Sequence, residues 1–328
     1  PMSKKGLLAA LASAIFLGLA PVFGKQAILL GLPWQAVVAL RTIFAALLLF
    51  LALLIFKRRY FYIYPAGLLG CLLAGTLNGL GSLFYYAALG RIDASLGQLL
   101  YSLYPWFLVV WLWLDRQPPS RLTLFRLALV IPAIYLLTRF PTFQVDFWGV
   151  LFMLVAAGLY ALHLPINQRV LFEMPAPTVT LYTLISMSLV VLPAALFIPM
   201  LSVAPALYAG PVLYTGLSPA LQLAAPAVLG LTLVTFLSRL TLFLGVKHLG
   251  GMQTAILGLG ELLVTLLLSH LWLGERLNPY QWAGALLLVA SLALVALEKP
   301  LPRHTNKDSW LSWLRPPGLP EDLPWPHD

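Results

Sequence analysis

Residues 21–25 read Pro-Val-Phe-Gly-Lys, and residues 165–169 read Pro-Ile-Asn-Gln-Arg, 144 positions further along the chain. The same spacing aligns Phe16 with Tyr160. Later in the chain, a spacing of 157 aligns three more pairs: Leu89 with Val246, Phe125 with Trp282, and Leu127 with Gly284. We infer that one hydrophobic pattern occurs twice in this chain.

Each copy of the pattern contains five apolar segments. Hydrophobic residues make up 61% of the 328 residues and charged residues only 9%, a composition that excludes a soluble domain. A helix needs about 20 apolar residues to cross about 30 Å of hydrocarbon. Helices fit better than barrel strands because the segments are long and none alternates. The predicted spans are residues 6–30, 33–56, 65–89, 92–114 and 120–138, then 148–172, 175–199, 224–247, 250–272 and 279–297.

The odd number of spans in each copy determines how the copies are oriented. After five crossings the chain is on the opposite side of the membrane, so the second copy enters upside down. We therefore predict an all-α polytopic membrane protein, with ten transmembrane helices in two inverted five-helix repeats around a central cavity. The repeats are residues 6–138 and 148–297, joined by a linker at 139–147, and a polar, proline-rich tail follows at 298–328. Inverted repeats are typical of secondary transporters.

Lysine and arginine residues gather at one set of span ends. The loops on that side hold Lys4, Lys5, Lys57, Arg58, Arg59, Arg116, Arg121, Arg169 and Lys247. The opposite loops hold only Arg91, Arg139 and Arg276. Cytoplasmic loops carry the excess of positive charge, so both termini and the tail are predicted to be cytoplasmic. Because the charges lie at span ends, the net charge of +9 does not indicate a nucleic-acid partner.

Three short features lie in register with this ten-span pattern. Residues 273–277 read Leu-Gly-Glu-Arg-Leu and are followed by a glycine at 284, Arg41 lies in the second span, and Glu261 lies in the ninth. Together they resemble the EamA-type transporters of the drug/metabolite transporter superfamily. The family often has Glu-Pro where this chain has Glu261-Leu262. In the first repeat, Pro118 stands at the position that matches Glu275.

The resemblance covers roughly residues 6–297. It implies alternating access through a cavity between the repeats, often with proton coupling or exchange. On this basis we predict an integral protein of a prokaryotic inner (plasma) membrane.

Four charged side chains inside predicted spans are candidates for the site: Lys25, Arg41, Arg239 and Glu261. A charge at the centre of a span costs about 2.5–3.5 kcal/mol on insertion scales, so it usually faces a cavity or a partner. Arg239 and Glu261 are expected at similar depth, where they either form part of the substrate site or make a structural ion pair. Glu261 is the candidate for proton coupling because no other acid lies deep in a span.

Lys25 and Arg41 are also expected at similar depth, nearer the outer face. Together they either form a positive access path for an anionic substrate or serve structural roles. In the structural alternative, Lys25 extends to the lipid headgroups, and Arg41 binds carbonyl groups where the repeats meet.

Uncharged polar and aromatic side chains complete the predicted substrate site: Asn78, Tyr86, Gln98, Tyr101, Tyr104, Tyr160, His163 and Asn167. The last three recur at i, i+3 and i+7, so they share a helix face that should meet protein or water rather than lipid. The alternative is hydrogen bonding between helices without substrate contact. His163 either carries a proton or is a packing residue.

Prolines and small residues are candidates for moving parts. Pro21 and Pro165 occupy equivalent positions in the two repeats, and with Pro105 they are predicted to kink helices and act in gating. Gly75 and Gly79 form a GxxxG pattern that allows helices to approach closely.

The predicted function is secondary active transport by alternating access. The substrate is predicted to be a small organic metabolite such as an amino acid, moved by an exporter or exchanger with possible coupling to protons. No nucleotide-binding or metal-binding motif occurs, so we expect no catalytic activity, no ATP, no cofactor and no metal. The expected partners are the substrate and the lipid bilayer, and the expected functional unit is a monomer. The alternatives are an intramembrane lipid-modifying enzyme and a passive channel or scaffold.

Overall fold

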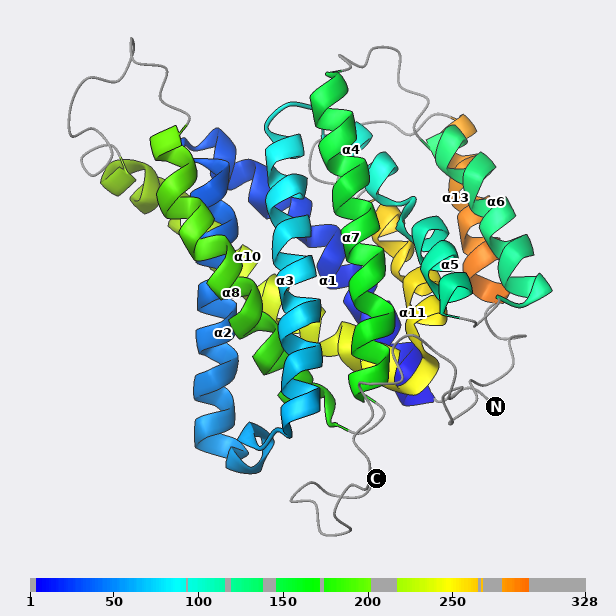
Figure 1. The fold of residues 1–328 in the computed structure, drawn as a ribbon. Helices are drawn as coiled ribbons and strands as arrows, with labels where there is room; N and C mark the ends of the chain where they lie inside the picture. Colours follow the sequence, from blue (N-terminus) through cyan, green and yellow to red (C-terminus); the bar gives the residue numbers. More distant parts are fainter. Residues whose placement is uncertain are drawn as a thin grey trace.

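The computed structural model describes residues 4–92, 94–115, 119–137, 146–171, 174–201, 217–264, 267 and 279–294. Within these ranges the regular elements are helices (Figure 1). The first half contains α1 (Lys4–Leu29), α2 (Trp34–Phe56), the 3-10 helix η1 (Arg58–Phe61), α3 (Pro65–Leu89), α4 (Ala94–Tyr101), α5 (Tyr104–Leu114) and α6 (Arg121–Leu137). The second half contains α7 (Phe147–Leu171), α8 (Ala176–Leu201), α10 (Leu217–Leu249), α11 (Gly251–Gly258) and α13 (Pro279–Ala293).

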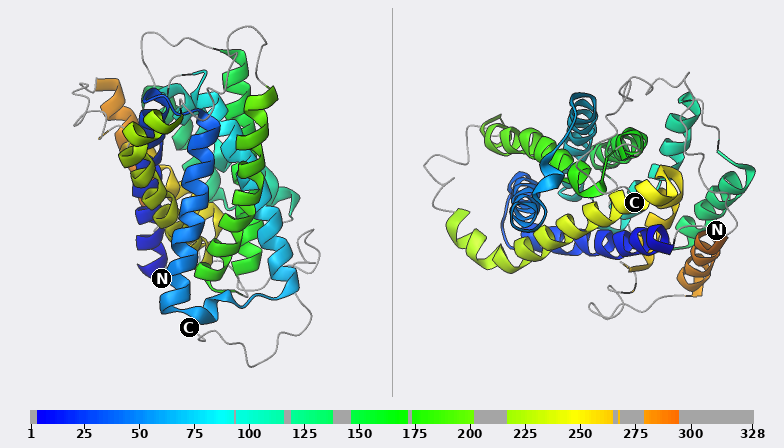
Figure 2. Two further views of the ribbon diagram at one scale, coloured as in Figure 1. Left: turned by 90° about the vertical axis from the view of Figure 1, so that its left-hand side faces the viewer. Right: turned by 90° about the horizontal axis from the view of Figure 1, so that it is seen from below.

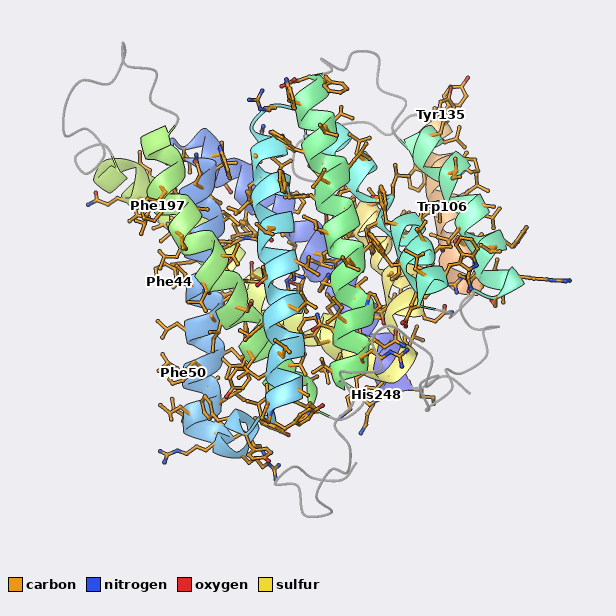
Figure 3. All side chains as sticks on the ribbon, in the orientation of Figure 1. Phe44, Phe50, Trp106, Tyr135, Phe197 and His248 are labelled. Atoms are coloured by element: carbon orange, nitrogen blue, oxygen red, sulfur yellow. The ribbon has the colours of Figure 1, made fainter. Side chains whose placement is uncertain are left out.

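Six of these helices are long and apolar enough to cross a membrane: α1, α2, α3, α7, α8 and α10. They coincide with six of the ten predicted spans. The other four predicted spans contain shorter helices over the described residues, so the count of ten stays a prediction. Large apolar side chains such as Phe44, Phe50 and Phe197 are exposed on the outer faces of α2 and α8 (Figure 3), as expected for surfaces that meet lipid.

The first helices of the two repeats run in opposite directions. The amine of Lys25, near the end of α1, donates to the carbonyl of Leu89 at the end of α3 over 3.0 Å. Two residues after Leu89, Arg91 forms a 3.0 Å salt bridge with Asp146, the residue just before α7 begins. Helix α1 therefore ends on the side where α7 starts (Figure 1). This is the relation that inverted repeats require.

Packing between helices follows the same internal symmetry. The first span of each repeat packs along the third span of the other repeat: α1 along α10, and α7 along α3. The second spans, α2 and α8, pack against each other. The last helices, α6 and α13, lie side by side at one edge of the molecule (Figures 1 and 2). The repeated hydrophobic pattern thus specifies matching interfaces.

Two glycines with positive φ lie at turns between helices. Gly31 has φ 98° and Gly250 has φ 88°, values that an L side chain rarely adopts. After α1, the amide of Leu32 donates to Ala27 and that of Gly31 to Ile28, which is the Schellman pattern. These bonds satisfy carbonyls that would otherwise be left open at the helix end, so the chain can reverse directly into α2.

The GxxxG residues of α3 lie against α8, as their small size suggested. A Cβ atom on Gly75 would lie 2.6 Å from the carbonyl oxygen of Thr183. One on Gly79 would lie 3.0 Å from the Cβ of Val190. The two helices approach closely because these positions lack side chains.

The fourth predicted span is two helices rather than one, which corrects the prediction that Pro105 kinks a continuous helix. Helix α4 ends at Tyr101, and α5 begins at Tyr104 with Pro105 in its first turn. Proline has no amide hydrogen, and its ring clashes with the carbonyl four residues before it. For Pro105 that carbonyl belongs to Tyr101, where α4 stops.

The ninth predicted span is interrupted at the matching place. Helix α11 ends at Gly258, a turn follows at Leu259, and helix resumes over residues 260–264. The amide of Leu259 donates to Ile256 instead of Ala255. The carbonyl of Ala255 accepts a 2.6 Å hydrogen bond from the Tyr104 hydroxyl instead. The spacing of 157 that aligns the repeats also relates Ser102, in the first break, to Leu259 in the second.

Some sequence predictions fall outside the described residues. They concern the motif at 274–276, the tail at 298–328 and most of the linker at 139–147.

Candidate functional site

One face of α3 is the base of the candidate site. Asn78, Ser82 and Tyr86 are spaced by four residues, so they lie on one face of the helix. All three are buried. Each contacts an arginine that belongs to another helix.

Arg41 of α2 contacts the end of this face that holds Ser82 and Tyr86. Its Nη2 atom donates to the Ser82 hydroxyl over 3.1 Å. Its guanidinium carbon lies 4.7 Å from the centre of the Tyr86 ring, a cation–π distance. Its Nε atom is buried and has no hydrogen-bond partner among the described residues. The described partners of Arg41 are therefore a hydroxyl and an aromatic ring of its own repeat, rather than carbonyls between the repeats.

Arg239 of α10 contacts the other end of the face. Its Nη2 atom donates to the side-chain oxygen of Asn78 over 3.3 Å. Its guanidinium carbon lies 5.7 Å from the centre of the Tyr160 ring. Both Nη1 of Arg239 and Nδ2 of Asn78 are buried donors without an acceptor among the described residues.

Glu261 lies in the same cluster, just after the break in the ninth span. Its carboxylate forms a hydrogen bond with Gln98 of α4 and is attracted electrostatically by Arg239. Arg239 and Glu261 thus meet in one site, but the hydrogen bonds described for each go to an amide side chain.

Five tyrosine rings connect these groups. Tyr101 lies 4.9 Å from Tyr85 and 5.3 Å from Tyr160, measured between ring centres. Tyr104 lies 4.9 Å from Tyr160. The Tyr85 hydroxyl donates to Gln98 over 3.3 Å, and Tyr85 also contacts Tyr86. The rings come from α3, α4, α5 and α7, so both repeats contribute to the aromatic cluster.

The polar side chains Tyr160, His163 and Asn167 of α7 differ in their contacts with this cluster. The His163 ring lies 4.7 Å from the Tyr160 ring, and its Nδ1 atom bonds the Tyr160 carbonyl. That contact is what a packing histidine would make. Asn167 lies one turn further along α7, is fully buried, and neither of its side-chain polar atoms has a partner among the described residues. Described contacts do not connect it with the cluster.

Lys25 and the paired prolines occupy other positions. The amine of Lys25 donates to the Leu89 carbonyl at the end of α3, and its described contacts do not include Arg41. Pro21 and Pro165 lie inside α1 and α7, and both helices continue through them. Their role in gating stays a prediction.

Sequence reasoning missed two buried arginines that bind specific partners. Arg169 at the end of α7 forms a 2.9 Å salt bridge with Asp115, and both side chains are almost fully buried. Arg126 of α6 donates to the Ser291 carbonyl over 3.1 Å and to Gln253 over 2.5 Å. Arg126 could have been found as a charge inside the predicted span 120–138. Asp115 and Arg169 both lie at span ends on the predicted cytoplasmic side, and this shared position is the sequence feature that could have indicated their pairing.

Within the part of the chain that is described, no group of three or more histidine, cysteine or acidic residues is placed to hold a metal ion.

Comparisons with known proteins agree with the repeated architecture. The model of a family described as the EamA-like transporter family matches residues 4–139 and 147–297, once for each repeat. No curated protein matches the chain in sequence. Solved structures of similar fold include a crystal structure with a TM-score of 0.66 and 16% sequence identity, over 89% of this chain and 96% of the other. At that identity the likeness shows the fold alone.

Proposed function

Because this chain belongs to the EamA-like transporter family, we propose that it is an alternating-access secondary transporter of a small organic metabolite such as an amino acid. It acts as an exporter or exchanger in a prokaryotic inner membrane, with both termini in the cytoplasm. It works as a monomer and without ATP.

One observation carries this proposal. Charged, amide and tyrosine side chains from both repeats converge where the fourth and ninth spans are interrupted. Tyr104, just after the first interruption, bonds to Ala255, just before the second. Discontinuous helices at the centre of inverted repeats commonly form the substrate sites of secondary transporters. Polar groups inside a membrane are energetically costly, which supports a functional role for the polar side chains of this cluster.

Glu261 is the proposed site of proton coupling. It is buried, and its neighbours Gln98 and Arg239 can stabilise its charged form through a hydrogen bond and electrostatic attraction. In this scheme, protonation of Glu261 alternates with binding of substrate near the arginines.

Counterflow in proteoliposomes tests the transport proposal. Vesicles are loaded with a mixture of unlabelled amino acids, and each labelled amino acid is added outside at trace concentration. We expect at least one label to accumulate transiently above equilibrium in vesicles with wild-type protein. Substitution of Arg239→Gln should abolish that overshoot, whereas Arg91→Gln at the exposed salt bridge should retain it. Equilibration of label without any overshoot would show a passive channel instead.

The proton-coupling scheme is tested separately. Exchange by the wild type should change with pH, and exchange by Glu261→Gln should not. If wild-type exchange is insensitive to pH, transport stands and the coupling scheme fails.

A further inference from the structure

We propose that the α3 face between Arg41 and Arg239 binds the carboxylate group of the substrate, so that the substrate is an organic anion or a zwitterion. This inference rests on the proposed function and names the chemical class of its substrate. We refer to Arg41, Asn78, Ser82 and Arg239 as the two-arginine site.

The first argument is the hydrogen-bond balance of the two-arginine site. Arg41 Nε, Asn78 Nδ2 and Arg239 Nη1 are buried N–H donors, and the described residues provide an acceptor for none of them. The three side chains are 7%, 2% and 5% exposed. A buried donor without an acceptor is unfavourable, and more so when the group is charged. Three such donors together predict a ligand that supplies acceptor oxygens.

The second argument is the charge balance. The two guanidinium groups are close enough to repel each other. Glu261 is the acid of this cluster, and it bonds to Gln98 while also attracting Arg239. Two positive charges therefore face one carboxylate, and a ligand with a single negative charge would balance them. A cationic substrate would add to the repulsion.

The third argument is the geometry of the donors. Ser82 and Asn78 are one helical turn apart on α3, and each already holds one Nη2 atom of its arginine, at 3.1 Å and 3.3 Å. The fixed guanidinium forks keep donors available, and planar forks of this kind match the two oxygens of a carboxylate. The tyrosine rings around Tyr101 provide apolar surface for the rest of the molecule.

Equilibrium binding to the purified full-length protein in nanodiscs tests this inference. The probes are acetate and benzoate, each compared with its neutral amide, acetamide or benzamide, by isothermal titration calorimetry. We expect at least one carboxylate to bind at least about tenfold more tightly than its amide, the factor expected for loss of one charge-assisted hydrogen bond. If neither carboxylate is preferred over its amide, the inference is wrong.

Variants locate the binding. Arg41→Gln and Arg239→Gln should each weaken carboxylate binding at least about tenfold. Asn78→Asp changes the shape of the site very little but places a competing carboxylate beside Arg239, so it should also weaken binding. Arg91→Gln removes one positive charge far from the site and should leave the affinity unchanged. Carboxylate binding that survives Asn78→Asp and Arg239→Gln would overturn the assignment.

Binding is measured without transport, so the two proposals can fail independently. Counterflow without preference for carboxylates would support the transport proposal and contradict the assignment of the two-arginine site. Specific carboxylate binding without counterflow would do the reverse.

Discussion

At the scale of single residues, the buried salt bridge between Asp115 and Arg169 makes a clear prediction about stability. Both partners are almost fully removed from solvent, at an N–O distance of 2.9 Å. Removal of one partner leaves a buried charge without compensation, which typically destabilises by about 3–5 kcal/mol. Asp115→Asn should therefore lower the free energy of unfolding by that order, measured by reversible denaturation in detergent micelles.

The double variant Asp115→Asn/Arg169→Gln serves as the control for that substitution. It removes both charges, so it should be less destabilised than the sum of the two single variants. Strict additivity of the single effects would mean that the two side chains are not energetically coupled.

The exposed salt bridge between Arg91 and Asp146 predicts a dependence of stability on pH. The hydrogen bond from Arg91 is the main reason that the pKa of Asp146 lies below its usual value of 3.8. A carboxyl whose pKa is lower in the folded protein stabilises the fold above its unfolded pKa. That contribution should be lost as the pH falls below 3.8 through the lower, folded-state pKa.

The measurement compares the unfolding free energies of the wild type and Asp146→Asn across this pH range. The difference should be small, because the pair is exposed, and it should vanish at the acid end. A difference that grows on acidification would contradict the prediction.

At the scale of elements, the contact between the two interrupted spans depends on Gly258. A Cβ atom at this position would lie 2.4 Å from the Tyr104 hydroxyl oxygen, which donates to the carbonyl of Ala255. Gly258→Ala should therefore displace Tyr104 and destabilise the protein by about 1–3 kcal/mol, the usual cost of overpacking. Thermal unfolding of the purified protein measures the effect.

Gly158 in α7 provides the matched control for Gly258. Among the described residues, a Cβ atom there would meet only a Phe107 ring carbon, at an ordinary distance of 3.8 Å. Gly158→Ala should leave stability unchanged or raise it by up to about 1 kcal/mol, because alanine favours helix more than glycine does. Equal losses in both variants would show that the contact with Tyr104 is not the cause.

At the scale of the whole molecule, the inverted repeats predict that equivalent changes affect opposite faces. Pro21 and Pro165 lie at matching positions in helices that run in opposite directions. In a Cys71→Ala background, single cysteines at the buried positions Ala27 and Leu164 report access from the two ends of the molecule. Pro21→Ala and Pro165→Ala should shift their rates of maleimide labelling in opposite senses.

The labelling experiment has a clear negative outcome. If neither proline substitution changes labelling at Ala27 or Leu164, the paired prolines do not act as gates. The inverted fold itself would be unaffected by that result.

Sequence alone determined the repeated architecture and indicated most residues of the candidate site. Both follow from the lipid environment. A segment in the membrane must be helical and apolar, so its length, its repetition and its few polar residues are visible in the local sequence. Ten of the eleven predicted substrate-binding residues lie in one connected cluster, and only Asn167 lies apart from it.

Tertiary structure decided which groups meet. Arg239 and Asn78 are 161 residues apart, and Tyr104 and Ala255 are 151 apart, so no local pattern relates them. The interruption at Leu259 has the same origin, because it depends on a hydroxyl from the other repeat that replaces a helix hydrogen bond. Composition and periodicity indicate which residues are buried. The partner of each buried polar group depends on how the two repeats pack together.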